Sequence, residues 1–189
     1  MDEWLQSLSI FQASTVLLSD WPRDPVDALF FHSRAQSDHE GLFGLATELW
    51  LSCMMKSVVL NGSDGEREGG TTPGEINPGK KFYLDNLRRA GVSNILLARP
   101  SYTTKGENDT FLAAAKTAGW KSAVMICQPH QVVRCVLGYV RSMATLGHEI
   151  ALFTATPRST PWSKLTHGSQ GYDELPRFAH IEKELSRIS

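Results

Sequence analysis

The chain lacks an excess of charge of either sign. It carries 19 Lys and Arg against 20 Asp and Glu in 189 residues, for a formal net charge of -1 and a pI near 6.6. Proteins that bind the phosphate backbone of nucleic acids present a basic surface, so this balance argues against a nucleic-acid partner. It is the composition of an ordinary water-exposed surface.

Long apolar runs are also missing. No stretch approaches the roughly 20 residues that cross a bilayer, and the first residues, MDEWLQSLSIF, are acidic where a signal peptide is basic. We therefore expect a cytoplasmic protein without a membrane partner.

Cysteine is scarce, and the common catalytic motifs are absent. The three cysteines are Cys53, Cys127 and Cys135. None belongs to a CxxC pair, so we expect buried thiols in a reducing compartment. The sequence contains no GxSxG, HExxH or GxxxxGK[ST], which excludes the usual serine hydrolases, zincins and P-loop proteins. His32, Asp38, His39 and Glu40 match no recognised zinc or iron spacing, so no metal is predicted.

Apolar segments of strand length alternate with longer helical patterns. The strands are predicted at 26–31, 57–62, 94–98, 121–128 and 148–157, and the helices at 42–55, 80–90, 110–120 and 131–147. This alternation predicts an α/β fold, a Rossmann-like three-layer sandwich with a mostly parallel central sheet. At this length we expect a single domain, 1–189. It includes an N-terminal helix (1–20), a long flexible loop (62–79) and a C-terminal tail with a helix (158–189).

Ligands of such sheets bind where the carboxyl ends of the strands meet the following helices. After the third strand, Thr103, Thr104, Glu107, Asn108 and Asp109 precede a helix that we expect to begin near Thr110. One interpretation is helix capping alone. The other is an anionic or ribose-like ligand, with Glu107 accepting its hydroxyl hydrogen bonds.

A second polar group follows the fourth strand, at Gln128, Pro129, His130, Gln131 and Arg134. Since Arg134 lies within an apolar helical pattern, its guanidinium either reaches solvent or meets an acidic group. The sharper hypothesis pairs it with Glu107 or with a ligand phosphate. His130 is either a general base or a surface residue that only hydrogen-bonds.

The ends of the first two strands carry further polar residues. Asn61, Gly62, Ser63 and Asp64 follow the second strand and form either an ordinary turn or a third part of the site. His32, Ser33 and Arg34 follow the first strand, where nucleotide-binding proteins of this fold usually place glycines.

The order of these motifs resembles a known family. The segments that carry the resemblance are VDALFF, VVLNGSDG, LRRAGV, TTKGEN and QPHQVVR, between Val26 and about Pro157. They resemble the bacterial family of unknown function typified by YdcF, SanA and ElyC, and are most similar to its soluble YdcF branch. The resemblance implies a Rossmann-like sheet with a pocket at the strand ends and S-adenosylmethionine as the candidate cofactor. The matching positions are Asn61, Gly62, Thr104, Gly106, Glu107, Asn108, Pro129 and Arg134.

The chain also departs from the family pattern. His32, Ser33 and Arg34 replace the glycine loop after the first strand, and Gly79 stands where a glutamate is expected. Lys105 replaces a usual threonine, and the histidine or tyrosine near the fourth strand is shifted to His130.

Three hypotheses for function remain open. The first is a protein that binds a nucleotide-like small molecule such as S-adenosylmethionine, with Glu107 on ribose hydroxyls and Arg134 on a carboxylate or phosphate, acting as a transferase of unknown reaction. The second is a hydrolase or transferase on a phosphate-containing substrate, with His130 or His32 as acid or base. The third is a non-catalytic interaction module that uses loop 62–79 and exposed Trp21 or Trp162. The candidate catalytic residues are His130, His32 and Glu107.

Overall fold

The computed structural model describes residues 20–33, 38–39, 41–65, 78–157, 162–167, 174–181 and 184. Its elements are β1 (Val26–Phe31), α2 (Leu42–Leu51), β2 (Met55–Asn61), α3 (Gly79–Arg89), β3 (Ile95–Ala98), α4 (Thr104–Ala118), β4 (Ser122–Ile126), η2 (Pro129–Gln131), α5 (Val132–Leu146), β5 (Ala151–Ala155), β6 (Leu165–His167), β7 (Glu174–Pro176) and η3 (Arg177–Ala179). The predicted N-terminal helix lies outside the described residues apart from its last position, as do most of loop 62–79 and much of the tail.

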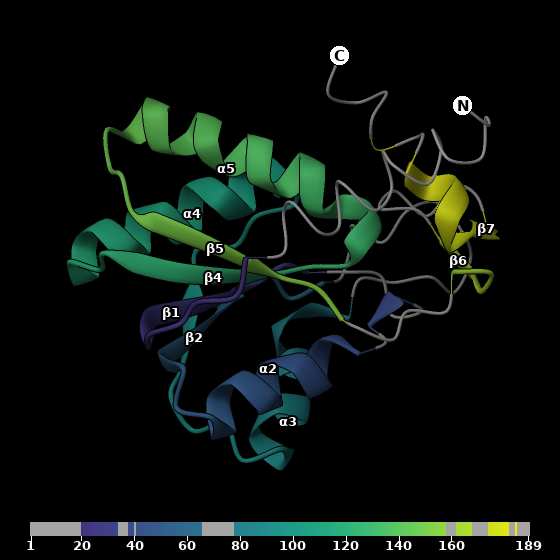
Figure 1. Cartoon of the computed structure of the whole chain (residues 1–189), viewed down its shortest axis with the longest axis horizontal. Coiled ribbons are helices and arrows are strands. Elements are labelled where there is room, and N and C mark those ends of the chain that lie inside the picture. Colours follow the sequence, from purple (N-terminus) through teal and green to yellow (C-terminus); the bar gives the residue numbers. More distant parts are fainter. Residues whose placement is uncertain are drawn as a thin grey trace.

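The central sheet has five strands, all parallel, in the order β3-β2-β1-β4-β5. The chain moves outward from β1 through β2 to β3, returns to place β4 on the other side of β1, and ends at β5 (Figure 1). The predicted α/β sandwich with a parallel sheet is confirmed. Its direction of winding reverses between β1 and β4, which is the topological switch point of the sheet.

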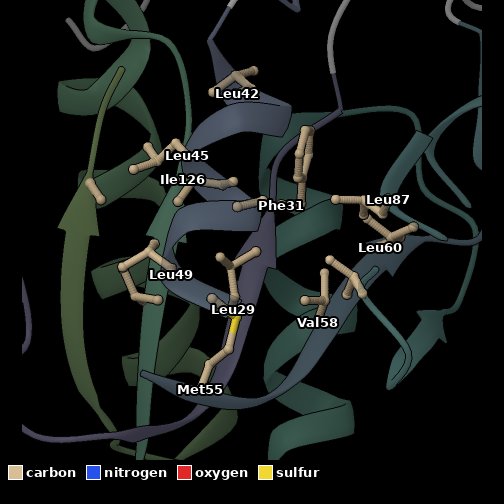
Figure 2. Close-up of a cluster of buried hydrophobic side chains, with 14 of the residues drawn as sticks. Leu29, Phe31, Leu42, Leu45, Leu49, Met55, Val58, Leu60, Leu87 and Ile126 are labelled. Atoms are coloured by element: carbon tan, nitrogen blue, oxygen red, sulfur yellow. The ribbon is translucent and has the colours of Figure 1, made fainter. Parts of the chain in front are cut away.

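Helices cover both faces of the sheet, α2 and α3 on one and α4 and α5 on the other (Figure 1). Successive side chains of a strand point to opposite faces, so β1 places Leu29 and Phe31 against α2 and α3, and Ala28 and Phe30 against α4 and α5. Figure 2 shows the cluster on the α2 and α3 face, in which residues of α2 spaced by a helical turn pack over β1. Burial on both faces explains why the strands appear in the sequence as continuous apolar runs.

Helix α4 begins at Thr104, not near Thr110 as predicted. Thr103 is its N-cap, and the Thr103 hydroxyl accepts a hydrogen bond from the Gly106 N–H at 3.1 Å. The first turns were missed because their residues are polar and show no helical periodicity of apolar side chains. Glu107 and Asn108 consequently lie on a rigid helix and not in a loop.

Smaller differences concern the segments around α2 and the tail. Helix α2 ends at Leu51 and β2 begins at Met55, so the helix is shorter and the strand longer than predicted. Asp38 does not cap α2: the N-cap is Gly41, without a side-chain hydrogen bond. The antiparallel pair of β6 and β7 was not predicted. Within the part of the chain that the structure describes, none of the helices has both the length and the apolar character needed to cross a membrane.

Candidate functional site

Three adjacent strands end in a row of polar side chains on the α4 and α5 face. Phe31 of β1 pairs with Leu60 of β2 and with Ile126 of β4. The residues one step further along these strands are His32, Asn61 and Cys127, and all three are buried. The β1–β4 ladder extends to this step, since the His32 N–H donates to the Ile126 carbonyl at 3.2 Å. We call Asn61, His32 and Cys127 the polar row.

Glu107, from the first turns of α4, binds two members of the row. Its Oε2 lies 2.8 Å from His32 Nδ1. Its Oε1 accepts hydrogen bonds from Asn61 Nδ2 at 3.0 Å and from the Ser33 N–H at 3.2 Å. The buried carboxylate therefore receives three protein donors, which is how a charge is tolerated in an interior.

Asn108, the next residue of α4, fixes the other side of the imidazole. Its Nδ2 donates to the Cys135 carbonyl of α5 at 3.4 Å, so its Oδ1 is turned toward His32, 3.1 Å from Nε2. Both ring nitrogens of His32 thus face acceptors. A neutral imidazole has only one N–H, so this arrangement favours the imidazolium form.

The Cys135 side chain completes the charge balance of the site. Burial by itself lowers the pKa of His32, but the charge and hydrogen bond of Cys135, followed by those of Glu107, raise it from 6.5 to about 10. A hydrogen bond with Cys127 lowers the pKa of Cys135, burial raises it, and the positive charges of His32 and Arg134 lower it again, so that it lies well below its ordinary value. The two pKa shifts favour an imidazolium between a carboxylate and a thiolate.

Asn61 also ties together the loops that follow β2 and β3. Its Nδ2 donates to the Ser101 carbonyl at 2.6 Å, and its Oδ1 accepts from the N–H groups of Ser63 and Ser101 at 3.1 and 3.0 Å. A Cβ on Gly62 would lie 2.3 Å from the Ala98 carbonyl oxygen, and one on Gly106 would lie 2.1 Å from the Ser101 hydroxyl. Gly62 is required here because it faces a backbone carbonyl, whereas a side chain at position 106 would mainly displace the Ser101 hydroxyl.

Arg134 pairs with Glu184 and not with Glu107. Its Nε contacts Glu184 Oε2, and both side chains are mostly buried. Two polar atoms of α5 and its N-cap, Arg134 Nη2 and Gln131 Oε1, are buried and make no hydrogen bond within the described residues. Pro129 and Gln131 form η2, which leads directly into α5 at the switch point.

His130 belongs to a different buried group, together with Asp38, Arg177 and His180. Its Nε2 lies 3.5 Å from Asp38 Oδ2, and its ring centroid lies 5.8 Å from that of His180. Nε and Nη2 of Arg177 donate to Asp38 Oδ1 at 3.2 and 3.0 Å. His130 is 3% exposed, so it is not a surface residue, and the hydrogen-bonding alternative for it stays open. The group anchors the C-terminal segment over the carboxyl ends of the strands.

Other sequence predictions have mixed outcomes. Cys127 and Cys135 are buried as expected, but Cys53 is exposed at the turn between α2 and β2. Trp21 is half-buried and packs against the core, so it is not the exposed residue that the interaction hypothesis used. Thr104 is half-buried in the first turn of α4. No group of three or more His, Cys, Asp or Glu side chains within the described ranges is arranged to hold a metal ion.

A cavity of about 490 Å³ lies at the opposite edge of the sheet. It is lined by Asp20, Trp21, Arg23 and residues at the starts of β1, β4 and β5. None of the predicted site residues lines it.

The fold and the site define a class: an α/β protein with a Rossmann-like parallel sheet and a buried charged network at its switch point. Comparison with protein-family models, curated proteins and solved structures gives no match. Membership of the family typified by YdcF, SanA and ElyC therefore stays a prediction.

Sequence reasoning overlooked the two cysteines as site residues. Cys127 follows the last residue of β4 just as His32 follows the last residue of β1. With β1 and β4 adjacent, equal steps beyond paired residues place both side chains on one face. Strand alternation was the available signal, but it needed the strand order.

Proposed function

We propose that the protein binds a small anionic molecule of nucleotide type in the crevice at the switch point, between the carboxyl ends of β1 and β4. The reversal of strand order there supports the proposal, because ligands of open α/β sheets bind outside the carboxyl ends of the strands at such a switch point. The start of α5 contributes the positive end of a helix dipole, which favours a negative ligand group.

The observation that carries the proposal is the pair of unsatisfied atoms, Gln131 Oε1 and Arg134 Nη2. A buried polar atom without a hydrogen bond costs about 1–3 kcal/mol. A ligand or water that bonds both atoms removes this cost. A ligand with an acceptor for Arg134 and a donor for Gln131 matches the pair.

The site residues then divide into two roles. Asn61, Glu107 and Asn108 hold His32 and the loops, forming the floor of the site. Arg134 meets the ligand's carboxylate or phosphate, for which a guanidinium is suited. Glu107 already receives three protein donors, which leave about one acceptor site of its carboxylate for a ribose hydroxyl.

S-Adenosylmethionine is the first ligand to test, since the family resemblance implies it and its carboxylate suits Arg134. The test is calorimetric titration of the folded protein with S-adenosylmethionine, ATP and AMP. We expect heat with at least one of them and an affinity lowered at least about tenfold in Arg134→Met. Arg141→Met is the matched control, because Arg141 is exposed on the same helix. Absence of heat with every ligand, or equal affinity in the two variants, would contradict the proposal.

The rival hypothesis of acid–base catalysis on a phosphate-containing substrate assigns the proton transfer to His32 or His130. A general base works best with a pKa near the working pH, whereas His32, with its pKa raised to about 10, keeps its proton at neutrality. We therefore favour binding over a His32 base. The third hypothesis depends largely on loop 62–79, most of which lies outside the described residues.

A further inference from the structure

Cys127 and Cys135 have no role in the proposed ligand binding. We propose that these two cysteines form a peroxide-reactive dithiol, in which Cys135 is oxidised first and Cys127 then closes a disulfide. The inference goes beyond the proposed ligand and does not depend on it.

The first argument is position. Cys127 lies beside His32 in the polar row, and Cys135 comes from the start of α5 onto the same face of the sheet. The two side chains belong to one buried cluster, and both Cys127 and His32 act to lower the pKa of the Cys135 thiol. A reactive cysteine with a second thiol already in contact is the arrangement found in redox-active sites.

The second argument is charge. His32 carries two acceptors, Glu107 Oε2 at 2.8 Å and Asn108 Oδ1 at 3.1 Å, so it is held as an imidazolium beside Cys135. Arg134, the neighbouring residue of α5, adds positive charge. Because the thiolate and not the thiol attacks peroxide, these groups prepare Cys135 and not Cys127 as the nucleophile.

The third argument is access. Cys135 is 1% exposed and Cys127 is fully buried. A bulky disulfide or alkylating agent is excluded from such a site, whereas hydrogen peroxide is close to water in size. We therefore assign hydrogen peroxide as the oxidant.

The chemistry balances in two steps. The Cys135 thiolate attacks one peroxide oxygen, the O–O bond breaks, and the departing hydroxide takes a proton to become water, leaving a sulfenic acid. The Cys127 sulfur then attacks the Cys135 sulfur, the S–O bond breaks, and the oxygen leaves as water with the proton of Cys127. Two thiols and one peroxide thus give one disulfide and two waters.

The test is mass spectrometry after limited hydrogen peroxide, on full-length protein carrying Cys53→Ser to remove the exposed thiol. We expect a loss of two hydrogens and a peptide linked between Cys127 and Cys135. With Cys127→Ser added, a sulfenic acid should appear on Cys135, trapped by dimedone that is added with denaturant after the peroxide has been removed. With Cys135→Ser added instead, Cys127 should stay reduced at the same dose.

A rate comparison needs no change in the charged network. At pH 7 an ordinary thiol is only a few per cent ionised. We therefore expect Cys135 to react with peroxide about tenfold faster than Cys53 does. The Cys53 rate is measured in the variant Cys127→Ser/Cys135→Ser. Between pH 6.5 and 8.5 the rate at Cys135 should rise less with pH than the rate at Cys53, because the pKa of Cys135 is lowered. A rate at Cys135 that rises with pH like that of Cys53, or no linked peptide from the folded protein, would overturn the inference.

Discussion

The buried charges of the site make a specific prediction for stability against pH in Cys135→Ser. In the unfolded chain His32 titrates near pH 6.5 and Cys135 near about 8.5. In the folded protein the pKa of His32 is raised to about 10 and that of Cys135 is lowered well below its ordinary value. His32 alone contributes stability that is complete below pH 6.5 and is lost as pH rises through about 10. Cys135 alone contributes stability that is present above its unfolded pKa and is lost as pH falls through its folded pKa.

Together the two groups cancel in the middle of the range. Between pH 6.5 and about 8.5 the folded pair binds one proton, on His32, and the unfolded pair also binds one, on Cys135. The pair therefore gives the wild-type protein no slope in this window. In Cys135→Ser the folded His32 keeps the Glu107 contact but loses the larger causes of its raised pKa, which come from Cys135, and the unfolded state binds no proton. The free energy of unfolding should then fall as pH rises, by at most about 1.4 kcal/mol per pH unit, over the part of the window in which His32 stays protonated.

The measurement is urea unfolding of both proteins under reducing conditions at several pH values between 6.5 and 8.5. All other titrating groups are shared, including Cys53 and Cys127, so the difference between the two curves isolates the pair. Parallel curves would contradict the prediction, because they require either a neutral Cys135 thiol in the wild-type fold or an unprotonated His32 in the folded variant. In the first case the dithiol proposal would lose its nucleophile.

Three further substitutions test other parts of the structure by the free energy of unfolding. Asp38→Asn leaves a buried arginine without its carboxylate and should cost about 3–5 kcal/mol. Asp85→Asn removes an exposed pair and should leave the free energy of unfolding almost unchanged. Similar losses in the two variants would contradict the buried pairing. Gly62→Ala should destabilise the protein by at least about 1 kcal/mol, because the new Cβ would lie 2.3 Å from a carbonyl oxygen. Gly44→Ala, at a helical position with open space around it, should stabilise the protein by up to about 1 kcal/mol. The opposite order would refute the packing argument. Gln131→Met should stabilise the free protein by about 1 kcal/mol and weaken ligand binding. The substitution removes a buried acceptor that only a ligand or water satisfies. Unchanged stability and affinity would count against the binding proposal.

Much of the fold could be predicted from the sequence because the physics is local. The bounds of β1 were predicted to the residue. Its apolar run lies between prolines and a polar segment, and a strand of a sheet that is buried on both faces has this continuous apolar pattern. The start of α4 was predicted wrongly. Its first turns are polar, so apolar periodicity gives no signal there, and the capping hydrogen bond of Thr103 is a contact between neighbouring polar residues.

The site could be predicted only in pieces. Asn61, His32 and Glu107 were each named as candidates, but as parts of separate loops. Their contacts depend on β2, β1 and β4 being adjacent, and the strand order is set by packing across the whole sheet. The partner of Arg134 was not predictable for a related reason, because several carboxylates were available and only the path of the C-terminal segment selects Glu184.

The two proposals meet at the start of α5, and this gives a last prediction. Arg134, the proposed ligand contact, directly precedes Cys135, and its charge acts on the Cys135 thiol. A ligand in the crevice would cover the mouth of the site and place negative charge beside Arg134, which excludes peroxide and weakens the stabilisation of the thiolate. A ligand that gives heat in calorimetry should therefore slow the oxidation of Cys135 in proportion to its occupancy, measured by the yield of the linked peptide. The oxidation of Cys53, which lies in the turn between α2 and β2, should be unchanged in the same sample. Equal slowing at both cysteines would indicate that the ligand only scavenges peroxide, and no slowing at Cys135 would separate the binding site from the dithiol.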